Sequence, residues 1–157
     1  MTTANFNEKY GPWALVTGAA EGLGLAFANH IAGEAMNVIL VDVQMDKAKE
    51  QAARIAKEYG VQTKALACDL AESNFIDGLT VDIKGYDIGL LICCAGIGVP
   101  GAFLDVPLSQ SHKTVQINCL STMTLCHHLA PPMIKRGRGG IVVIASNSGY
   151  AGAWSVA

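Results

Sequence analysis

Short continuous apolar runs alternate along this chain with segments in which apolar residues recur every three or four positions. The runs predict strands that are buried on both faces, and the periodic segments predict amphipathic helices. The predicted strands are Trp13–Thr17, Asn37–Val43, Thr63–Cys68, Ile88–Cys94 and Ile141–Ser146. The predicted helices are Leu23–Ala32, which Gly33 closes, a segment from Asp46 to Gly60, Glu72–Leu79, and Leu108–Met133, which Pro131 and Pro132 bend or break.

Strand and helix alternate five times, and this order is typical of βαβ units that build a parallel sheet. We therefore predict an α/β fold, namely a Rossmann-like, three-layer, doubly wound parallel sheet. The chain of 157 residues shows no internal repeat and no linker, so we assign residues 1–157 to a single domain.

The composition excludes several classes of partner. Apolar residues make up 51% of the chain, charged residues make up 15%, and the formal net charge is −2. This balance gives no reason to expect a nucleic-acid partner, which would need a basic surface. The N-terminus lacks the apolar core of a signal peptide, and no apolar run approaches the roughly 20 residues of a membrane span. We therefore expect no membrane association and a cytoplasmic location.

The chain has five cysteines, an odd number. We therefore expect reduced thiols, as in an intracellular protein. Cys126, His127 and His128 are adjacent, but no second group of ligands matches them in spacing. The sequence therefore predicts no metal site.

The stretch LVTGAAEGLG places Gly18, Gly22 and Gly24 between the first predicted strand and the first predicted helix. A helix N-terminus offers unpaired N–H groups and the positive end of the helix dipole, and glycine lets the backbone approach a pyrophosphate. Asp42 ends the second strand at the spacing, roughly 20 residues, at which an acid accepts hydrogen bonds from the adenosine ribose. These features predict a dinucleotide site; an FMN site in a flavodoxin-like fold is the weaker alternative, because the spacing to Asp42 fits a dinucleotide better.

The negative charges near the glycine loop favour NAD over NADP. Asp42 would repel a 2′-phosphate on the ribose, and Glu21 is a second negative charge where a phosphate would need Arg or Lys. We expect NAD as the cofactor, with NADP as the less favoured alternative.

The order Thr-Gly-x-x-x-Gly-x-Gly resembles the cofactor loop of the short-chain dehydrogenase/reductase family. Further stretches match that family in order: CDL at Cys68–Leu70, CCAG at Cys93–Gly96, Asn118 in VQINCLSTM and Ser146 in IVVIASNSG. Together these motifs cover nearly the whole chain. The cofactor-binding residues that the loop, its spacing and the resemblance indicate are Gly18, Ala20, Glu21, Gly22, Leu23, Gly24, Asp42, Val43, Asp69, Leu70, Cys94, Ala95 and Gly96.

The resemblance implies an NAD-dependent oxidoreductase that transfers a hydride between the nicotinamide cofactor and a small-molecule alcohol or ketone. It also implies that Ser146 holds the substrate oxygen and that Asn118 anchors a water in a proton relay. Members of the family commonly assemble through the long helix, so we expect a homodimer or homotetramer of the full-length protein.

Two departures from the family pattern stand out. Cys93 and Cys94 replace two asparagines, and because a thiol is a weak donor, Cys94 should support the central strand less well. The family's Tyr-x-x-x-Lys is absent, since Tyr150 is followed four positions later by Trp154. We therefore expect the chain to be the N-terminal portion, through the fifth strand, of a longer oxidoreductase, and to be inactive alone.

In the family the sheet continues past the fifth strand. Without that continuation the apolar fifth strand would be an unprotected edge, which predicts a tendency to aggregate. The alternative is a shortened, non-catalytic nucleotide-binding domain. A Tyr-x-x-x-Lys beyond Ala157 would distinguish the two.

Overall fold

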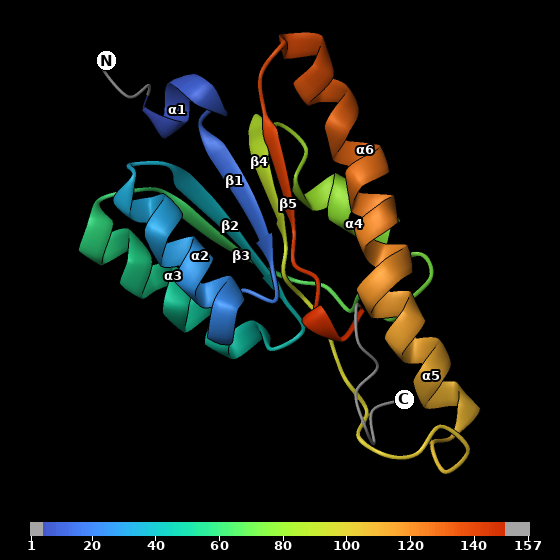
Figure 1. Cartoon of the computed structure of the whole chain (residues 1–157). Coiled ribbons are helices and arrows are strands. Elements are labelled where there is room, and N and C mark those ends of the chain that lie inside the picture. The colour runs from blue at the N-terminus through green and yellow to red at the C-terminus, as the bar shows by residue number, and fades with distance from the viewer. Residues whose placement is uncertain (1–4, 150–157) are drawn as a thin grey trace.

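The computed structural model describes residues 5–149, which form one parallel sheet of five strands in the order β3-β2-β1-β4-β5 (Figure 1). The strands are β1 (Trp13–Thr17), β2 (Asn37–Asp42), β3 (Thr63–Ala67), β4 (Ile88–Cys93) and β5 (Gly140–Val143). Every pairing is parallel. This order confirms the predicted Rossmann-like α/β fold, and it places the topological switch point between β1 and β4.

Helices cover both faces of the sheet, as Figure 1 shows. On one face lie α2 (Gly22–Gly33) and α3 (Met45–Tyr59), and on the other lie α4 (Phe75–Asp82) and α6 (Ser121–Arg136). The remaining elements are α1 (Phe6–Lys9), α5 (Leu108–Val115), a π-helix (Gln116–Leu120) that joins α5 to α6, and a 3₁₀ turn (Asn147–Gly149).

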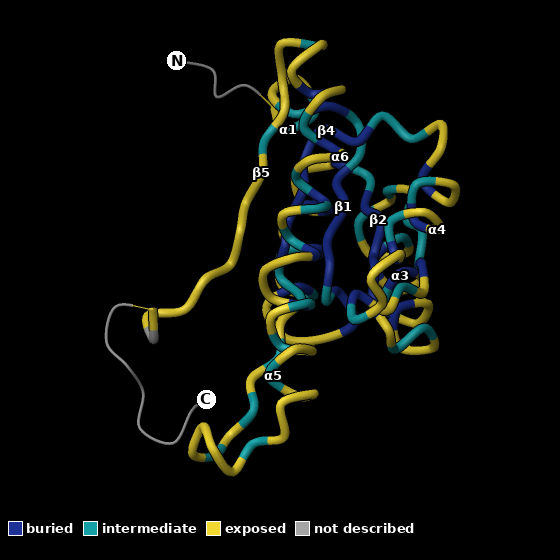
Figure 2. The backbone as a smooth tube through the Cα atoms, turned by 90° about the vertical axis from the view of Figure 1, so that its right-hand side faces the viewer, coloured by how far each residue is buried: buried dark blue, intermediate teal, exposed yellow. Residues whose placement is uncertain are grey.

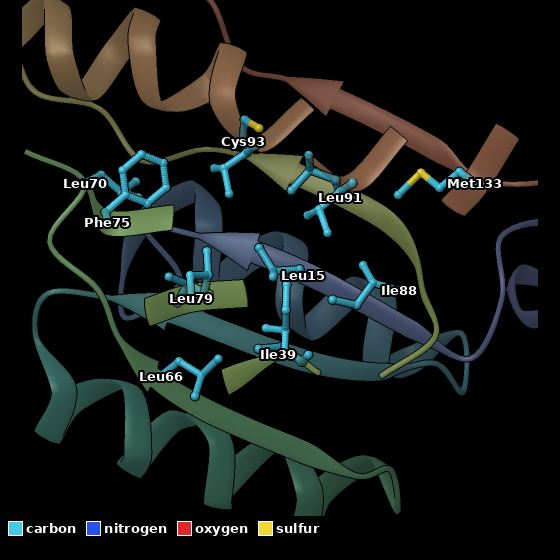
Figure 3. Close-up of a cluster of buried hydrophobic side chains, with 14 of the residues drawn as sticks. Leu15, Ile39, Leu66, Leu70, Phe75, Leu79, Ile88, Leu91, Cys93 and Met133 are labelled. Carbon is cyan, nitrogen blue, oxygen red and sulfur yellow. The ribbon is translucent and has the colours of Figure 1, made fainter. Parts of the chain in front are cut away.

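Successive side chains of each central strand enter two different cores. Leu15 and Ile39 belong to the cluster shared with α4 and α6 (Figure 3), whereas Val16 and Leu40 belong to the cluster under α2 and α3. Side chains alternate across a strand, so a strand covered on both faces must be apolar at every position. This requirement explains the continuous apolar runs in the sequence.

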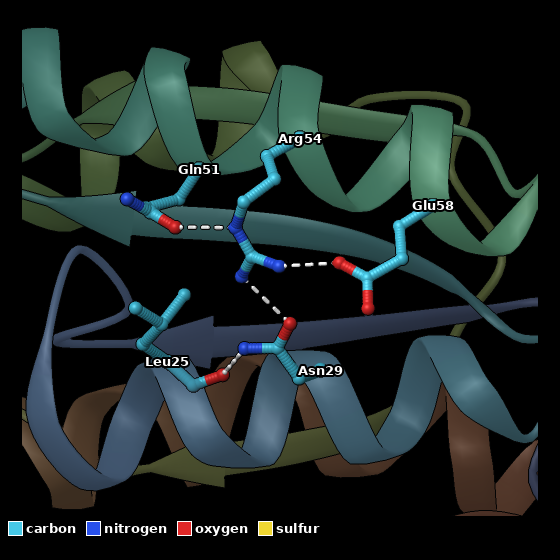
Figure 4. A network of polar contacts seen from close by, with 5 residues as sticks. All are labelled: Leu25, Asn29, Gln51, Arg54 and Glu58. Carbon is cyan, nitrogen blue, oxygen red and sulfur yellow. Dashed lines mark hydrogen bonds and ion pairs between the residues drawn. The ribbon is translucent and has the colours of Figure 1, made fainter.

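A polar network fastens α2 to α3 on the outer surface (Figure 4). The Arg54 guanidinium donates to Gln51 Oε1, Glu58 Oε2 and Asn29 Oδ1 at 2.6–2.9 Å. Asn29 in turn donates from Nδ2 to the Leu25 carbonyl at 2.7 Å. The two helices that flank the glycine loop are therefore joined by a side-chain network as well as by their shared core.

One predicted helix end and one predicted helix break differ from the structure. Gly33 lies inside α2 as its last residue, and the left-handed turn after the helix is made by Ala35, with φ of 59°. The helix that begins at Leu108 is not broken at Pro131 and Pro132, which lie within α6. Proline has a helical φ, and the packing of α6 into the core compensates for the backbone hydrogen bonds that two prolines remove. The irregularity lies instead in the π-helix at Gln116–Leu120.

The strand β5 lies at the edge of the sheet, beside β4 only. Ile141, Val142 and Val143 are all exposed, and Figure 2 shows this strand in yellow beside the dark blue central strands. Within residues 5–149, β4 is thus the one strand that pairs with β5, and the apolar side chains of β5 are exposed. Within residues 5–149 no helix combines the length and the apolar character needed to cross a bilayer.

Candidate functional site

A cavity of about 460 Å³ opens at the carboxyl ends of the strands, where the connections after β1, β2, β3 and β4 meet. Its lining residues are Gly18, Glu21, Leu23, Gly24, Val41, Asp42, Val43, Gln44, Cys68, Asp69, Leu70, Cys94, Ala95, Gly96, Ile97 and Ile117. In open parallel sheets a ligand occupies the crevice at this edge. Eleven of the thirteen predicted cofactor residues line it, while Ala20 and Gly22 lie beside it in the same loop.

The glycine loop is held in place by close backbone contacts. Gly18 has φ of 65°, and a Cβ there would lie 2.9 Å from Ala95 Cα. A Cβ on Gly24 would collide with the Gly18 carbonyl. Side chains at either position would push the loop away from α2 and β4, so both positions require glycine.

The N-terminus of α2 faces this cavity through Leu23 and Gly24. Glu21 is the N-cap residue, yet its side chain makes no capping hydrogen bond. The N–H groups of the first turn therefore have no side-chain acceptor from the cap, which leaves them available to an anion.

Thr17 links the two connections at the switch point. Its hydroxyl is buried, accepts the N–H groups of Cys94 and Ala95 at 3.1 Å each, and lies 3.5 Å from the Ile92 carbonyl. Support for this segment therefore comes from the Cys94 backbone rather than from its thiol. Sequence reasoning did not select Thr17, although a hydroxyl directly before the first glycine of the motif was the available signal.

Asp42 makes hydrogen bonds to two of the loops that surround the cavity. Oδ2 accepts the Ala20 N–H at 3.0 Å and Oδ1 accepts the Gln44 N–H at 2.9 Å. The side chain is buried, and each carboxylate oxygen keeps a lone pair for a further donor. Asp42 thus connects the glycine loop to the β2–α3 connection and can still accept hydroxyl groups.

Glu21 is not the isolated negative charge that the sequence suggested. Its Oε2 lies 2.9 Å from Lys47 Nζ, across the connection between β2 and α3. Hydrogen bonds from Lys47 and Gln44 hold the pKa of Glu21 below its usual value. Lys47 lies 26 positions away in the sequence, and only the fold reveals it as the partner.

The far wall of the cavity is formed by the connections after β3 and β4. Asp69 Oδ1 accepts the Ala71 N–H at 2.9 Å, which forms a turn that holds the carboxylate at the cavity edge. Burial raises the pKa of the Cys68 thiol to about 11 and also raises that of Cys94. Both thiols therefore stay neutral near pH 7 and give the wall an apolar character.

Neither of the two predicted catalytic residues is among the residues that line this cavity. Asn118 is part of the π-helix, and its amide makes two hydrogen bonds to the Ile97 backbone, at 2.9 and 2.8 Å. With both amide ends engaged, Asn118 positions the β4 connection. Ser146 is exposed, follows β5 at the same sheet edge, and accepts the Gly149 N–H at its carbonyl.

Over the described part of the chain, no group of three or more His, Cys, Asp or Glu side chains is arranged to hold a metal ion. Tyr150 and Trp154 lie outside the described residues. Within residues 5–149 the cavity thus has backbone donors from the N-terminus of α2, a buried carboxylate at Asp42 and an apolar wall with neutral thiols.

Comparison with known proteins identifies the family. The family model described as short chain dehydrogenase matches residues 12–157. This chain belongs to the short-chain dehydrogenase family. The very-long-chain 3-oxoacyl-CoA reductase of Homo sapiens is 33% identical over 143 residues, which cover 88% of this chain and 46% of the reductase. The chain spans about half the length of the curated relatives it matches.

Solved structures of short-chain dehydrogenases share the fold. One, from a study of 7beta-hydroxysteroid dehydrogenase stereoselectivity, superposes with a TM-score of 0.92 and 28% identity, covering 97% of this chain and 59% of that one. A short-chain dehydrogenase from Sphingobium yanoikuyae in complex with NADPH gives a TM-score of 0.86 and 28% identity, covering 92% and 57%. The sheet described above is therefore that of a family fold, and these relatives are longer than this chain.

Proposed function

We propose that this short-chain dehydrogenase binds a nicotinamide dinucleotide and belongs to an oxidoreductase that interconverts an alcohol and a ketone. The observation that carries the proposal is the position of the glycine loop, whose uncapped α2 N-terminus opens into a cavity at the β1–β4 switch point. Family membership and the NADPH complex of the Sphingobium yanoikuyae relative support it.

The residues present fit the adenosine and pyrophosphate parts of such a coenzyme. The first-turn N–H groups of α2 would bind the pyrophosphate, and the remaining lone pairs of Asp42 would accept ribose hydroxyls. Asp69 and Leu70 would lie against the adenine. The coenzyme would supply the hydride, while this chain orients it and excludes water along the apolar wall.

On the substrate side we assign Ser146 to hold the reacting oxygen by a hydrogen bond. Asn118 fixes the β4 connection that would border the nicotinamide, and a water in a proton relay would be held by backbone groups beside it. The proton donor is expected in a Tyr-x-x-x-Lys segment beyond the described residues. The names of two relatives, a 3-oxoacyl-CoA reductase and a 7beta-hydroxysteroid dehydrogenase, favour a secondary alcohol or its ketone as the substrate class.

We further propose that NAD is preferred to NADP. Asp42 is buried beside the expected ribose position, and a 2′-phosphate there would meet its charge. The NADPH bound by the Sphingobium yanoikuyae relative points the other way for that protein. The affinities for NAD⁺ and NADP⁺, measured on the same protein, test this preference.

The assembled protein is proposed to be a homo-oligomer. Apolar side chains that are at least two-fifths exposed follow one another along α5, the π-helix and α6; they are Leu108, Val115, Leu120 and Met123. Such a stripe suits contact with a second copy of the long helix. The cytoplasmic location stays a prediction.

The test combines binding and turnover in the full-length protein. Calorimetric titration with NADH and NADPH measures binding, and loss of coenzyme absorbance in the presence of a 3-oxoacyl thioester or a ketosteroid measures turnover. Binding together with turnover supports the oxidoreductase. Binding without turnover by any carbonyl compound would favour a non-catalytic nucleotide-binding domain, and absence of binding by a folded protein would refute the site itself.

A further inference from the structure

Glu21 and Lys47 face each other at the rim of the cavity. Glu21 is the residue before α2 and lines the cavity, whereas Lys47 lies in the first turn of α3. Their charged atoms are 2.9 Å apart, and both side chains are more than half exposed. The ion pair therefore joins the glycine loop to the first turn of α3, on either side of the place where the adenosine ribose is expected.

Lys47 occupies an unfavourable place for a cation. The first turn of a helix carries the positive end of the helix dipole, which repels an ammonium group. The Glu21 carboxylate offsets this repulsion. Because exposed ion pairs contribute little to stability, this partnership can be exchanged for a stronger anion at small cost.

Asp42, the neighbouring negative group, is fixed by backbone hydrogen bonds, although each of its oxygens keeps a lone pair. Both carboxylate oxygens of Asp42 accept backbone N–H groups, from Ala20 and from Gln44. Asp42 is thus held in the wall, while Glu21 and Lys47 are exposed side chains that can rotate. A dianionic phosphate at the ribose would form a charge-assisted hydrogen bond with an ammonium group within reach.

We propose that Lys47 is a concealed 2′-phosphate site, in which Glu21 holds the ammonium group until a coenzyme with a 2′-phosphate competes for it. Glu21 then determines specificity chiefly by occupying the cation, and only secondarily by repelling the phosphate. This inference rests on the proposed function, because it needs the adenosine ribose to lie at the end of β2.

The test is a double-mutant cycle in the full-length protein, with NAD⁺ and NADP⁺ titrated separately by calorimetry. Glu21→Gln should raise the affinity for NADP⁺ relative to NAD⁺ by about threefold to tenfold, in the range expected for exposed charge pairs. Lys47→Met introduced into that variant should remove the gain, because the released cation is then missing. Circular dichroism confirms that each variant is folded.

Glu58→Gln is the matched control. Glu58 pairs with Arg54 on the same helix α3, so this change removes one exposed, ion-paired carboxylate at a position away from the cavity rim (Figure 4). It should leave the NADP⁺ to NAD⁺ affinity ratio unchanged.

Two results would overturn the inference while leaving the proposed function intact. One is an unchanged affinity ratio in Glu21→Gln, and the other is a gain that persists when Lys47 is removed, which would indicate repulsion by Glu21 alone. If the folded parent protein binds neither coenzyme, the proposed function fails and the inference fails with it.

Discussion

Two regions of this sheet are equally apolar in sequence and very different in structure. Val38 of β2 is 0% exposed, whereas Val142 of β5 is 36% exposed and Val143 is 51% exposed. The central strands are covered by helices on both faces, while β5 has a single neighbouring strand and little cover. An apolar run therefore predicts a strand, but its burial depends on the layers that pack against it.

The opposite edge of the sheet shows what a protected edge looks like. In β3, Lys64 Nζ donates to the Asp82 carbonyl at 2.9 Å and lies 4.9 Å from the centre of the Tyr86 ring. A lysine on an edge strand discourages pairing with another chain. β5 carries no charged residue, so nothing on this strand discourages pairing with a further strand.

The largest expected effect comes from placing the same charge in the two regions. Val38→Lys buries an ammonium group without a partner and should abolish folding, since an uncompensated buried charge costs several kcal/mol. Val142→Lys should change the free energy of unfolding by about 1 kcal/mol or less, because its side chain reaches solvent. Urea denaturation followed by circular dichroism measures both.

Val142→Lys should also reduce self-association, which light scattering during size-exclusion chromatography would detect. Equal destabilisation by the two substitutions would show that β5 is as enclosed as β2 and would remove the contrast between the regions.

Gly24→Val should lower the stability by about 3 kcal/mol, because its side chain would collide with the Gly18 carbonyl. Gly78→Ala in α4 is the matched control, since a Cβ there meets no atom within 4 Å. That variant should be neutral or slightly more stable. Thermal denaturation compares them, and a stable Gly24→Val protein would contradict the packing described for the glycine loop.

Ser146→Ala probes the chemistry assigned to the β5 region. In the full-length enzyme we expect turnover to fall by about 100-fold, because the hydrogen bond to the reacting oxygen is lost. Coenzyme affinity should stay the same, since Ser146 is not among the residues that line the cavity. Steady-state kinetics and calorimetry provide the two readouts, and unchanged turnover would remove Ser146 from the mechanism.

Asp42→Ala tests the buried end of β2, and its expected effect is the smallest of the four. Loss of a hydrogen-bonded carboxylate should weaken NAD binding by about tenfold or more and NADP binding much less. Calorimetry on the full-length protein measures both affinities. An equal loss for both coenzymes would mean that Asp42 acts only as a brace for the Ala20 and Gln44 backbone.

Much of the fold is predictable because its signals are local. The five apolar runs fix the strands to within a few residues, and the position of the glycines between β1 and α2 fixes the cavity edge. Gly60, the last residue of the segment predicted as a helix, ends α3 in the left-handed conformation.

The features that sequence reasoning missed all depend on contacts between distant segments. Nothing local marks Lys47 as the partner of Glu21. The hydroxyl of Thr17 before the first glycine is a local signal, but it does not identify the Ala95 N–H as the donor. The π-helix at Gln116–Leu120 was missed because Pro131 and Pro132 gave a stronger local signal for a break. In α6, the packing against the sheet outweighs the tendency of the two prolines to end a helix.

The hydrogen bonds of Thr17 join segments that are synthesised at different times on the ribosome. Its hydroxyl accepts the N–H of Ala95, which is 78 positions later in the chain. At roughly 5–20 residues per second, several seconds pass between the synthesis of the glycine loop and the arrival of that partner. During this interval β1 lacks the neighbour β4, so β1 to β3 emerge as a partial sheet with the apolar side of β1 uncovered. Nascent chains should therefore be most vulnerable to chaperone capture or proteolysis before β4 emerges, and protected soon afterwards.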